Sequence, residues 1–151
     1  MDAVTYPDDA VITFINRNLV PLRIPSDRQP LADEYEVAWT PALFILDQEG
    51  HTHQATVGFF SPEEFIPSLL LGIGNMYFHK DDFTKALDHY AAILADHADS
   101  DAVPEALFHT GVARYKSSGD PKPLKEAYQE LAKEFPESTW TKRAYPYRLI
   151  Q

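Results

Sequence analysis

Six histidines and the absence of cysteine limit the chemistry that this sequence of 151 residues can perform. His51 and His53 are two positions apart, so on a strand their side chains would point to the same side. Zinc sites generally use three or four close ligands, and these two histidines lack an evident third. The remaining histidines all fall in segments with helical patterns: His79, His89, His97 and His109. The sequence therefore predicts no metal site.

Other catalytic patterns are also missing. Without cysteine there is no thiolate nucleophile, disulfide or Cys-ligated zinc. Ser61 and Ser68 lack the Gly-x-Ser-x-Gly context of a hydrolase, and Gly72 and Gly74 fall inside an expected helix rather than a phosphate-binding loop. The acidic residues expected in helix-to-helix loops lack the glycine and final glutamate of an EF-hand: Asp81, Asp82, Asp96, Asp99 and Asp101. We expect neither catalysis nor a cofactor from this chain.

Charge and hydropathy narrow the possible partners. The net charge is −10, from 23 acidic and 13 basic residues, which repels a nucleic-acid backbone. The longest basic cluster is Lys142-Arg143 with Arg148 nearby, so nucleic acid is not an expected partner. No apolar run reaches the ~18 residues that span a bilayer, and the N-terminus "MDAVTYPDDAV" is acidic, unlike a signal peptide. The sequence favours a soluble, cytoplasmic protein with no membrane partner.

The first half of the chain has the pattern of a mixed α/β structure. Apolar runs mark its helices and strands, and turn residues separate them. The expected elements are a helix at 7–18, a strand at 19–24 ("LVPLRI"), a helical turn or two in "PLADEYEV", a strand in "PALFILD" and a returning strand in "HQATVGF". The turn "DQEGHT", which contains Gly50, predicts that the last two strands form an antiparallel hairpin.

The second half is predicted to be entirely helical. Ser61, Pro62 and Glu64 form a capping box that starts a helix. This helix has no flexible break before Tyr77, although Pro67 should kink it by removing one backbone hydrogen bond. Further helices are expected at 82–97, 102–117, 122–135 and from Thr139 to about Pro146.

The helical half also repeats itself with an offset of 38 residues. The matched pairs are Tyr77 with Tyr115, Tyr90 with Tyr128, Ser100 with Ser138 and Ala106 with Ala144. Gly74, Tyr77, Ala86 and Tyr90 have the small-and-aromatic spacing that lets two helices approach closely, and the segment from Leu70 to Ser100 resembles a tetratricopeptide repeat. A second unit resembles it through Gly111, Tyr115, Ala127, Tyr128 and Phe135-Pro136, but it has Leu124 where Ala86 stands.

The order of elements in the first half resembles a thioredoxin-like domain that lacks its beginning. In that family a Thr-Pro pair carries a cis-proline before a buried strand, and Thr40-Pro41 is the match. The residues that match the strand, turn and next strand are Leu43, Phe44, Ile45, Leu46, Asp47, Gly50 and Gly58. Met1 falls where the family's first long helix should be, so the preceding strand and the Cys-x-x-Cys are absent. The predicted fold class is α/β: an incomplete thioredoxin-like sheet of about three strands in residues 1–72, then a tetratricopeptide-like helical array in residues 73–151.

The two resemblances leave two functional hypotheses open. The first is a non-catalytic module that binds a protein or extended peptide. The family's substrate cleft then implies contacts from Ala38, Trp39, Thr40 and Pro41, although Trp39 could equally fill the core. The second is the C-terminal portion of a thioredoxin-like thiol-disulfide oxidoreductase, whose strand and Cys-x-x-Cys would lie upstream of Met1.

The missing central strand carries a further expectation. Its loss leaves strand edges unpaired, and exposed apolar edges are natural association sites. We therefore expect a homodimer that uses the first helix, including Phe14, or the edge of "LVPLRI".

Overall fold

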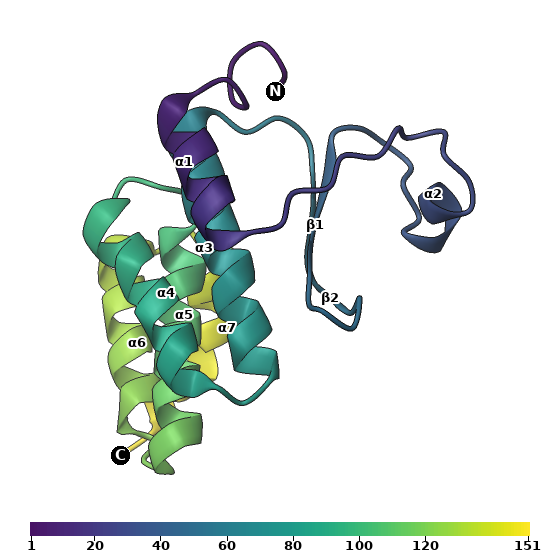
Figure 1. Cartoon of the computed structure of the whole chain (residues 1–151). Coiled ribbons are helices and arrows are strands. Elements are labelled where there is room, and N and C mark those ends of the chain that lie inside the picture. The colour runs from purple at the N-terminus through teal and green to yellow at the C-terminus, as the bar shows by residue number, and fades with distance from the viewer. The chain divides into compact units, whose positions relative to one another are not determined.

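A computed structural model describes every residue, 1–151, as two compact units, Met1–Ile66 and Pro67–Gln151 (Figure 1). The first unit contains α1 (Asp9–Asn18), α2 (Leu31–Glu34), β1 (Ala42–Leu46), β2 (Thr52–Val57) and the start of α3 (Pro62–His79). The second contains the rest of α3, α4 (Phe83–Asp96), α5 (Val103–Ser118), α6 (Lys122–Glu134), α7 (Thr139–Ala144) and the 3₁₀ helix η1 (Tyr145–Leu149).

The first unit begins with a capped helix. The Asp8 carboxylate accepts hydrogen bonds from the amides of Ala10 and Val11, which satisfies two of the donors that a helix leaves free at its start. Pro7 precedes this cap, so α1 begins two residues later than the expected residue 7. The small aromatic cluster of this unit consists of Tyr6, Phe60 and Phe65, with ring centroids 5.8 Å apart for Tyr6–Phe65 and 6.2 Å for Phe60–Phe65.

The expected strand at 19–24 does not form. The sheet has two strands, not about three, and "LVPLRI" runs without a ladder partner. Pro21 cannot donate a backbone hydrogen bond, and Val20 and Leu22 are 97% and 81% exposed. The apolar composition of the run was therefore a misleading signal, because no neighbouring strand or core covers it.

The predicted hairpin is present. β1 and β2 pair antiparallel, with Ala42 opposite Val57 and an irregularity in the register between Ile45 and Leu46. Gly50 adopts a positive φ of 85° at the turn, where a side chain would be strained. The Thr40–Pro41 peptide bond, directly before β1, is cis, as is the Gln29–Pro30 bond.

Helix α3 starts in the first unit and ends in the second. It begins at Pro62, directly after Ser61, and continues through Pro67 to His79. The sequence predicted one helix, bent at Pro67, with no flexible break between Ser61 and Tyr77, and the continuity of the helix is confirmed.

The second unit is a stack of helical hairpins. Figure 1 shows α4, α5 and α6 lying side by side, and their mutual contacts join them into one bundle. Ile93 and Leu131 are fully buried there, and Ala106 and Ala144, which the offset of 38 pairs, are fully buried as well. The internal repeat of the sequence therefore corresponds to equivalent core positions.

Glycines set the distance between paired helices. A Cβ added at Gly74 of α3 would lie 2.6 Å from Cε1 of Tyr90 on α4, which is closer than two carbon atoms can approach. A Cβ added at Gly111 of α5 would likewise lie 2.6 Å from Cβ of Ala127 on α6. Leu124 differs from its counterpart Ala86, yet the second hairpin keeps the close contact because Ala127 takes that role.

The turns between hairpins are also equivalent. The Ser100 hydroxyl accepts from the amide of Ala102 at the start of α5, and the Ser138 hydroxyl accepts from that of Trp140 at the start of α7. Thr141 is buried, and its hydroxyl donates to the carbonyl of Phe135, which fastens α7 to the end of α6. The last helix ends before Pro146, as its position predicts.

Candidate functional site

Half-buried rings from successive hairpins form a continuous line across the second unit. We call this line the aromatic row, and it consists of Phe78, Phe108, His109, Trp140 and Tyr147. The centroid distances are 5.6 Å for Phe78–His109, 5.4 Å for His109–Trp140 and 6.0 Å for Phe108–Tyr147. The row thus joins α3 and α5, the first helices of the two hairpins, to α7 and η1, which close the stack.

His109, at the centre of the aromatic row, is held neutral. Its ring stacks on that of Tyr90 with a centroid distance of 5.8 Å, and its Nδ1 has no hydrogen-bond partner. Burial, together with the nearby positive charges of His79 and Arg143, lowers the pKa of His109 from 6.5 to about 4. At neutral pH, His109 therefore behaves as an aromatic packing residue and carries no positive charge.

A polar chain underlies the aromatic row. The Tyr90 hydroxyl donates to the amide oxygen of Asn75 at 2.8 Å, and the Asn75 side chain is close enough to the Glu105 carboxylate to lower its pKa. Burial raises the pKa of Glu105, whereas the Asn75 side chain and the charge of Arg143 lower it. The Tyr90–Asn75 hydrogen bond connects α3 to α4, and Glu105 of α5 lies next to it.

Arg143 of α7 provides the positive charge of this surface. Its guanidinium carbon lies 4.6 Å from the centroid of Trp140, a cation–π contact. Arg143 is exposed, and its charge lowers the pKa of the Glu105 carboxyl on α5. Stacking fixes the plane of the guanidinium while its N–H groups remain available, an arrangement that suits recognition of a carboxylate.

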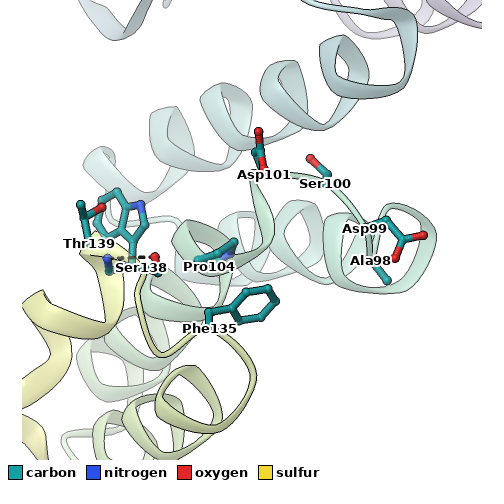
Figure 2. A pocket seen from close by; sticks show the side chains of 9 residues that line it. Ala98, Asp99, Ser100, Asp101, Pro104, Phe135, Ser138 and Thr139 are labelled. Atoms are coloured by element: carbon teal, nitrogen blue, oxygen red, sulfur yellow. Dashed lines mark hydrogen bonds between the residues drawn. The ribbon is translucent and has the colours of Figure 1, made fainter.

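A hollow lies beside the aromatic row, between the two equivalent turns. Figure 2 shows side chains from the α4–α5 turn and from the segment before α7 around it. Its volume is about 560 Å³, and it is lined by Ala98, Asp99, Ser100, Asp101, Pro104, Phe135, Ser138, Thr139 and Trp140. The Ser138 hydroxyl caps α7, the Ser100 hydroxyl accepts from the amide of Ala102 in the turn before α5, and no histidine lines the hollow as a base. It therefore has no arrangement for nucleophilic catalysis.

The interaction residues expected from the sequence lie in the first unit, on the segment before β1. Ala38, Trp39 and Thr40 are exposed and Pro41 is half-buried. Trp39 is 73% exposed, so it does not fill the core. The four residues are consecutive and mostly accessible, but they belong to a different unit from the aromatic row.

Comparison with known families supports the helical part. The family model described as tetratricopeptide repeat matches residues 68–100 and 105–138. These two segments correspond to the hairpins α3–α4 and α5–α6, so the second unit contains tetratricopeptide-type helical hairpins. The comparisons with curated proteins and with solved structures gave no match.

The resemblance of the first unit to a thioredoxin-like domain finds no support. The family match lies outside residues 1–66, and the third strand that this fold requires is not formed. A hairpin after a proline, followed by a helix, is too short a pattern to specify a fold. None of the helices combines the length and the apolar character needed to cross a membrane.

The aromatic row cannot be recognised from residue spacing. In the sequence, His109 is one of several histidines in predicted helices, and Arg143 belongs to a small basic cluster. A usable signal was present, because aromatic residues recur in the first helix of each hairpin, at Phe78, Phe108 and Trp140. What the sequence could not show is that these rings meet.

Proposed function

We propose that this protein is a non-catalytic interaction module that binds a segment of a partner protein along the aromatic row. One observation carries the proposal: a continuous line of half-buried rings crosses two tetratricopeptide-type hairpins and ends beside an exposed, stacked arginine. Aromatic rings offer large contact area at a small entropic cost. The Arg143 guanidinium offers a place for a carboxylate of the partner segment.

The segment Ala38–Pro41 is proposed as a second contact region. Trp39 supports this proposal, because a largely exposed tryptophan in a soluble unit is a frequent binding residue. Such a contact does not depend on the thioredoxin-like resemblance. It requires only that an extended partner can lie along an exposed segment next to β1.

Selection of peptides from a random displayed library against the full chain tests both regions. Arg143→Glu reverses the charge at the aromatic row, and Trp39→Ala removes the second proposed contact. The matched controls are Lys142→Glu, which makes the same charge change on α7, and Phe59→Ala, which removes another exposed ring. All four sites are exposed, so folding should be retained, and circular dichroism checks this.

We expect the selected peptides to contain an acidic residue and to bind Arg143→Glu at least tenfold more weakly than the wild type. Lys142→Glu should bind within about twofold of the wild type. Binding that depends on Trp39 alone would place the function in the first unit and contradict the assignment to the aromatic row. Failure to select any saturable binder would contradict the whole proposal.

A homodimer is also proposed, through the apolar surface of the first unit. Its support is the exposure of Val20 and Leu22, and a shallow hollow on α1 that includes Phe14. Light scattering over a hundredfold range of concentration should give a dimer mass that Leu22→Asp reduces to the monomer mass. A monomer mass for the wild type at every concentration would refute this proposal.

A further inference from the structure

An apolar run in the first unit remains without a covering partner. Residues 19–25, "LVPLRIP", follow α1 and belong to no helix or strand. Val20 and Leu22 are 97% and 81% exposed, although valine and leucine are among the residues most often buried in folded proteins. Neighbouring exposed apolar side chains of this kind indicate an interaction surface.

Proline limits the conformations that this run can adopt. Pro21 and Pro25 fix their own φ angles, and each disfavours a helical conformation in the residue before it. The run is therefore restricted to extended shapes and loses little conformational entropy on binding. Surfaces lined by aromatic rings are frequent receptors for extended segments that contain proline. The run thus has the properties of a ligand for a surface of rings.

The aromatic row offers such a surface at a matching spacing. Side chains two positions apart on an extended backbone point to the same side and lie roughly 6–7 Å apart. Val20 and Leu22 stand in this relation. Successive rings of the row, those of Phe78, His109 and Trp140, have centroids 5.6 and 5.4 Å apart. The two apolar side chains therefore fit on neighbouring rings.

Charge favours the same pairing. The first unit has 11 acidic and 3 basic side chains, whereas residues 139–151, around the end of the row, have three basic side chains and no acidic one. Asp27 is exposed and follows the apolar run, just as Arg143 lies beside a ring at the end of the row. Arg23, the basic residue within the run, is paired with Asp2 at 2.8 Å. An ion pair between Asp27 and Arg143 is thus compatible with the apolar contacts.

We propose that the aromatic row binds residues 19–27 of a second copy of this chain. The inference rests on the proposed function of the row, and it identifies both the partner segment and the surface that covers Val20 and Leu22 in the homodimer. These two side chains lie on the rings, and Asp27 pairs with Arg143 of the other copy. The first unit of one copy thus supplies the segment, and the second unit of the other supplies the row.

Self-association of single and mixed variants tests this pairing. Leu22→Asp disables the segment and leaves the row intact, whereas Arg143→Glu disables the row and leaves the segment intact. Lys142→Glu makes the same charge change at the neighbouring exposed position of α7 and is the matched control. Analytical ultracentrifugation gives the dissociation constant of each full-length variant, and circular dichroism checks that each is folded.

We expect Leu22→Asp and Arg143→Glu each to weaken self-association by about tenfold or more, and Lys142→Glu to change it by less than about twofold. A mixture of Leu22→Asp and Arg143→Glu should form a heterodimer, because the first variant has an intact row and the second has an intact segment. A synthetic peptide of residues 18–29 should bind the Leu22→Asp chain, and adding Arg143→Glu to that chain should weaken its binding by about tenfold or more.

Self-association of Arg143→Glu with the affinity of the wild type would overturn the proposal and assign the dimer to contacts between first units alone. A wild type that stays monomeric, a mixture without heterodimer, or a peptide of residues 18–29 that does not bind would overturn it as well. Peptides selected from the random library test the row itself, so failure of this inference is distinguishable from failure of the proposed function.

Discussion

The two units bury their apolar side chains to very different extents. In residues 1–66 only Val11, Ile45 and Phe65 are buried apolar residues, whereas the second unit has a continuous core along α4, α5 and α6. The exposed large apolar residues are divided the opposite way: Val4, Ile12, Val20, Leu22, Trp39, Leu46, Val57 and Phe59 in the first unit, and Tyr115, Tyr145 and Leu149 in the second. Helical hairpins with small residues at their crossings make a core of their own, and the short hairpin of the first unit does not.

The charge of the chain is divided unevenly as well. Residues 1–66 have 11 acidic and 3 basic side chains, and residues 67–151 have 12 and 10. The first unit therefore carries most of the net charge of −10. Partners with acidic segments should be repelled by the first unit and tolerated by the second, where Arg143 lies.

The two units should differ most in the stability that is lost when a large apolar side chain is shortened. Leu131→Ala removes a side chain that is fully buried in the second unit and should cost about 2–5 kcal/mol of unfolding free energy. Val20→Ala in the first unit removes a side chain that is 97% exposed and should change stability by less than about 0.5 kcal/mol. Urea unfolding followed by circular dichroism measures both. Equal losses from the two substitutions would contradict the division between the units.

Acid should destabilise the second unit through His109. The unfolded chain binds a proton at His109 below about pH 6.5, whereas the folded chain binds it only near pH 4. The stabilisation is therefore complete above pH 6.5 and is lost as the pH falls toward 4, by on the order of 3 kcal/mol at most. Glu105, whose pKa is raised by burial, acts in the opposite direction.

Unfolding at pH 7 and pH 5 in the wild type and in His109→Gln isolates this contribution. The variant retains Glu105, His79 and Arg143, the other charged or titratable groups facing the site. We expect a smaller loss of stability between the two pH values in His109→Gln. An identical loss in both proteins would show that His109 is not the group responsible.

Substituting glycine should destabilise the second unit by a steric clash and the first unit by backbone strain. Gly111→Ala places a Cβ 2.6 Å from that of Ala127 and should cost about 1–3 kcal/mol. A Cβ added at Gly50 meets no atom within 4 Å. Its φ of +85° is unfavourable for alanine, however, so Gly50→Ala should cost about 1–2 kcal/mol of stability. Ala127→Gly removes the Cβ that a new Cβ at position 111 would meet. In unfolding experiments it should therefore restore part of the stability that Gly111→Ala loses. No rescue would mean that the helices do not meet at this point.

The smallest expected effect is at the exposed ion pair of the first unit. Arg23 and Asp2 lie 2.8 Å apart, but their side chains are 79% and 63% exposed. Solvent screens such a pair, so Asp2→Asn should change stability by about 0–1 kcal/mol. A loss comparable to that of Gly111→Ala would show that the first unit depends on this contact more than its exposure suggests.

The sequence predicted the helical half well. The hairpins and their matched core positions could be predicted because they depend on contacts between residues close in the sequence. The signals of these contacts are the spacing of small and aromatic residues, the cap at Ser61 and the repeat with an offset of 38. The strand at 19–24 could not, because whether an apolar run becomes a strand depends on a partner strand elsewhere in the chain. The aromatic row depends on tertiary geometry, which spacing alone does not give.

Binding of a partner segment along the aromatic row of the second unit can be tested directly. The direct measurement is photo-cross-linking of the full chain with a selected peptide that carries a photoreactive residue, followed by mass-spectrometric mapping of the linked sites. The account predicts cross-links to α3, α5, α7 and η1, near Phe78, Phe108 and Trp140, and their loss in Arg143→Glu but not in Lys142→Glu. Cross-links confined to residues 19–60 would contradict it.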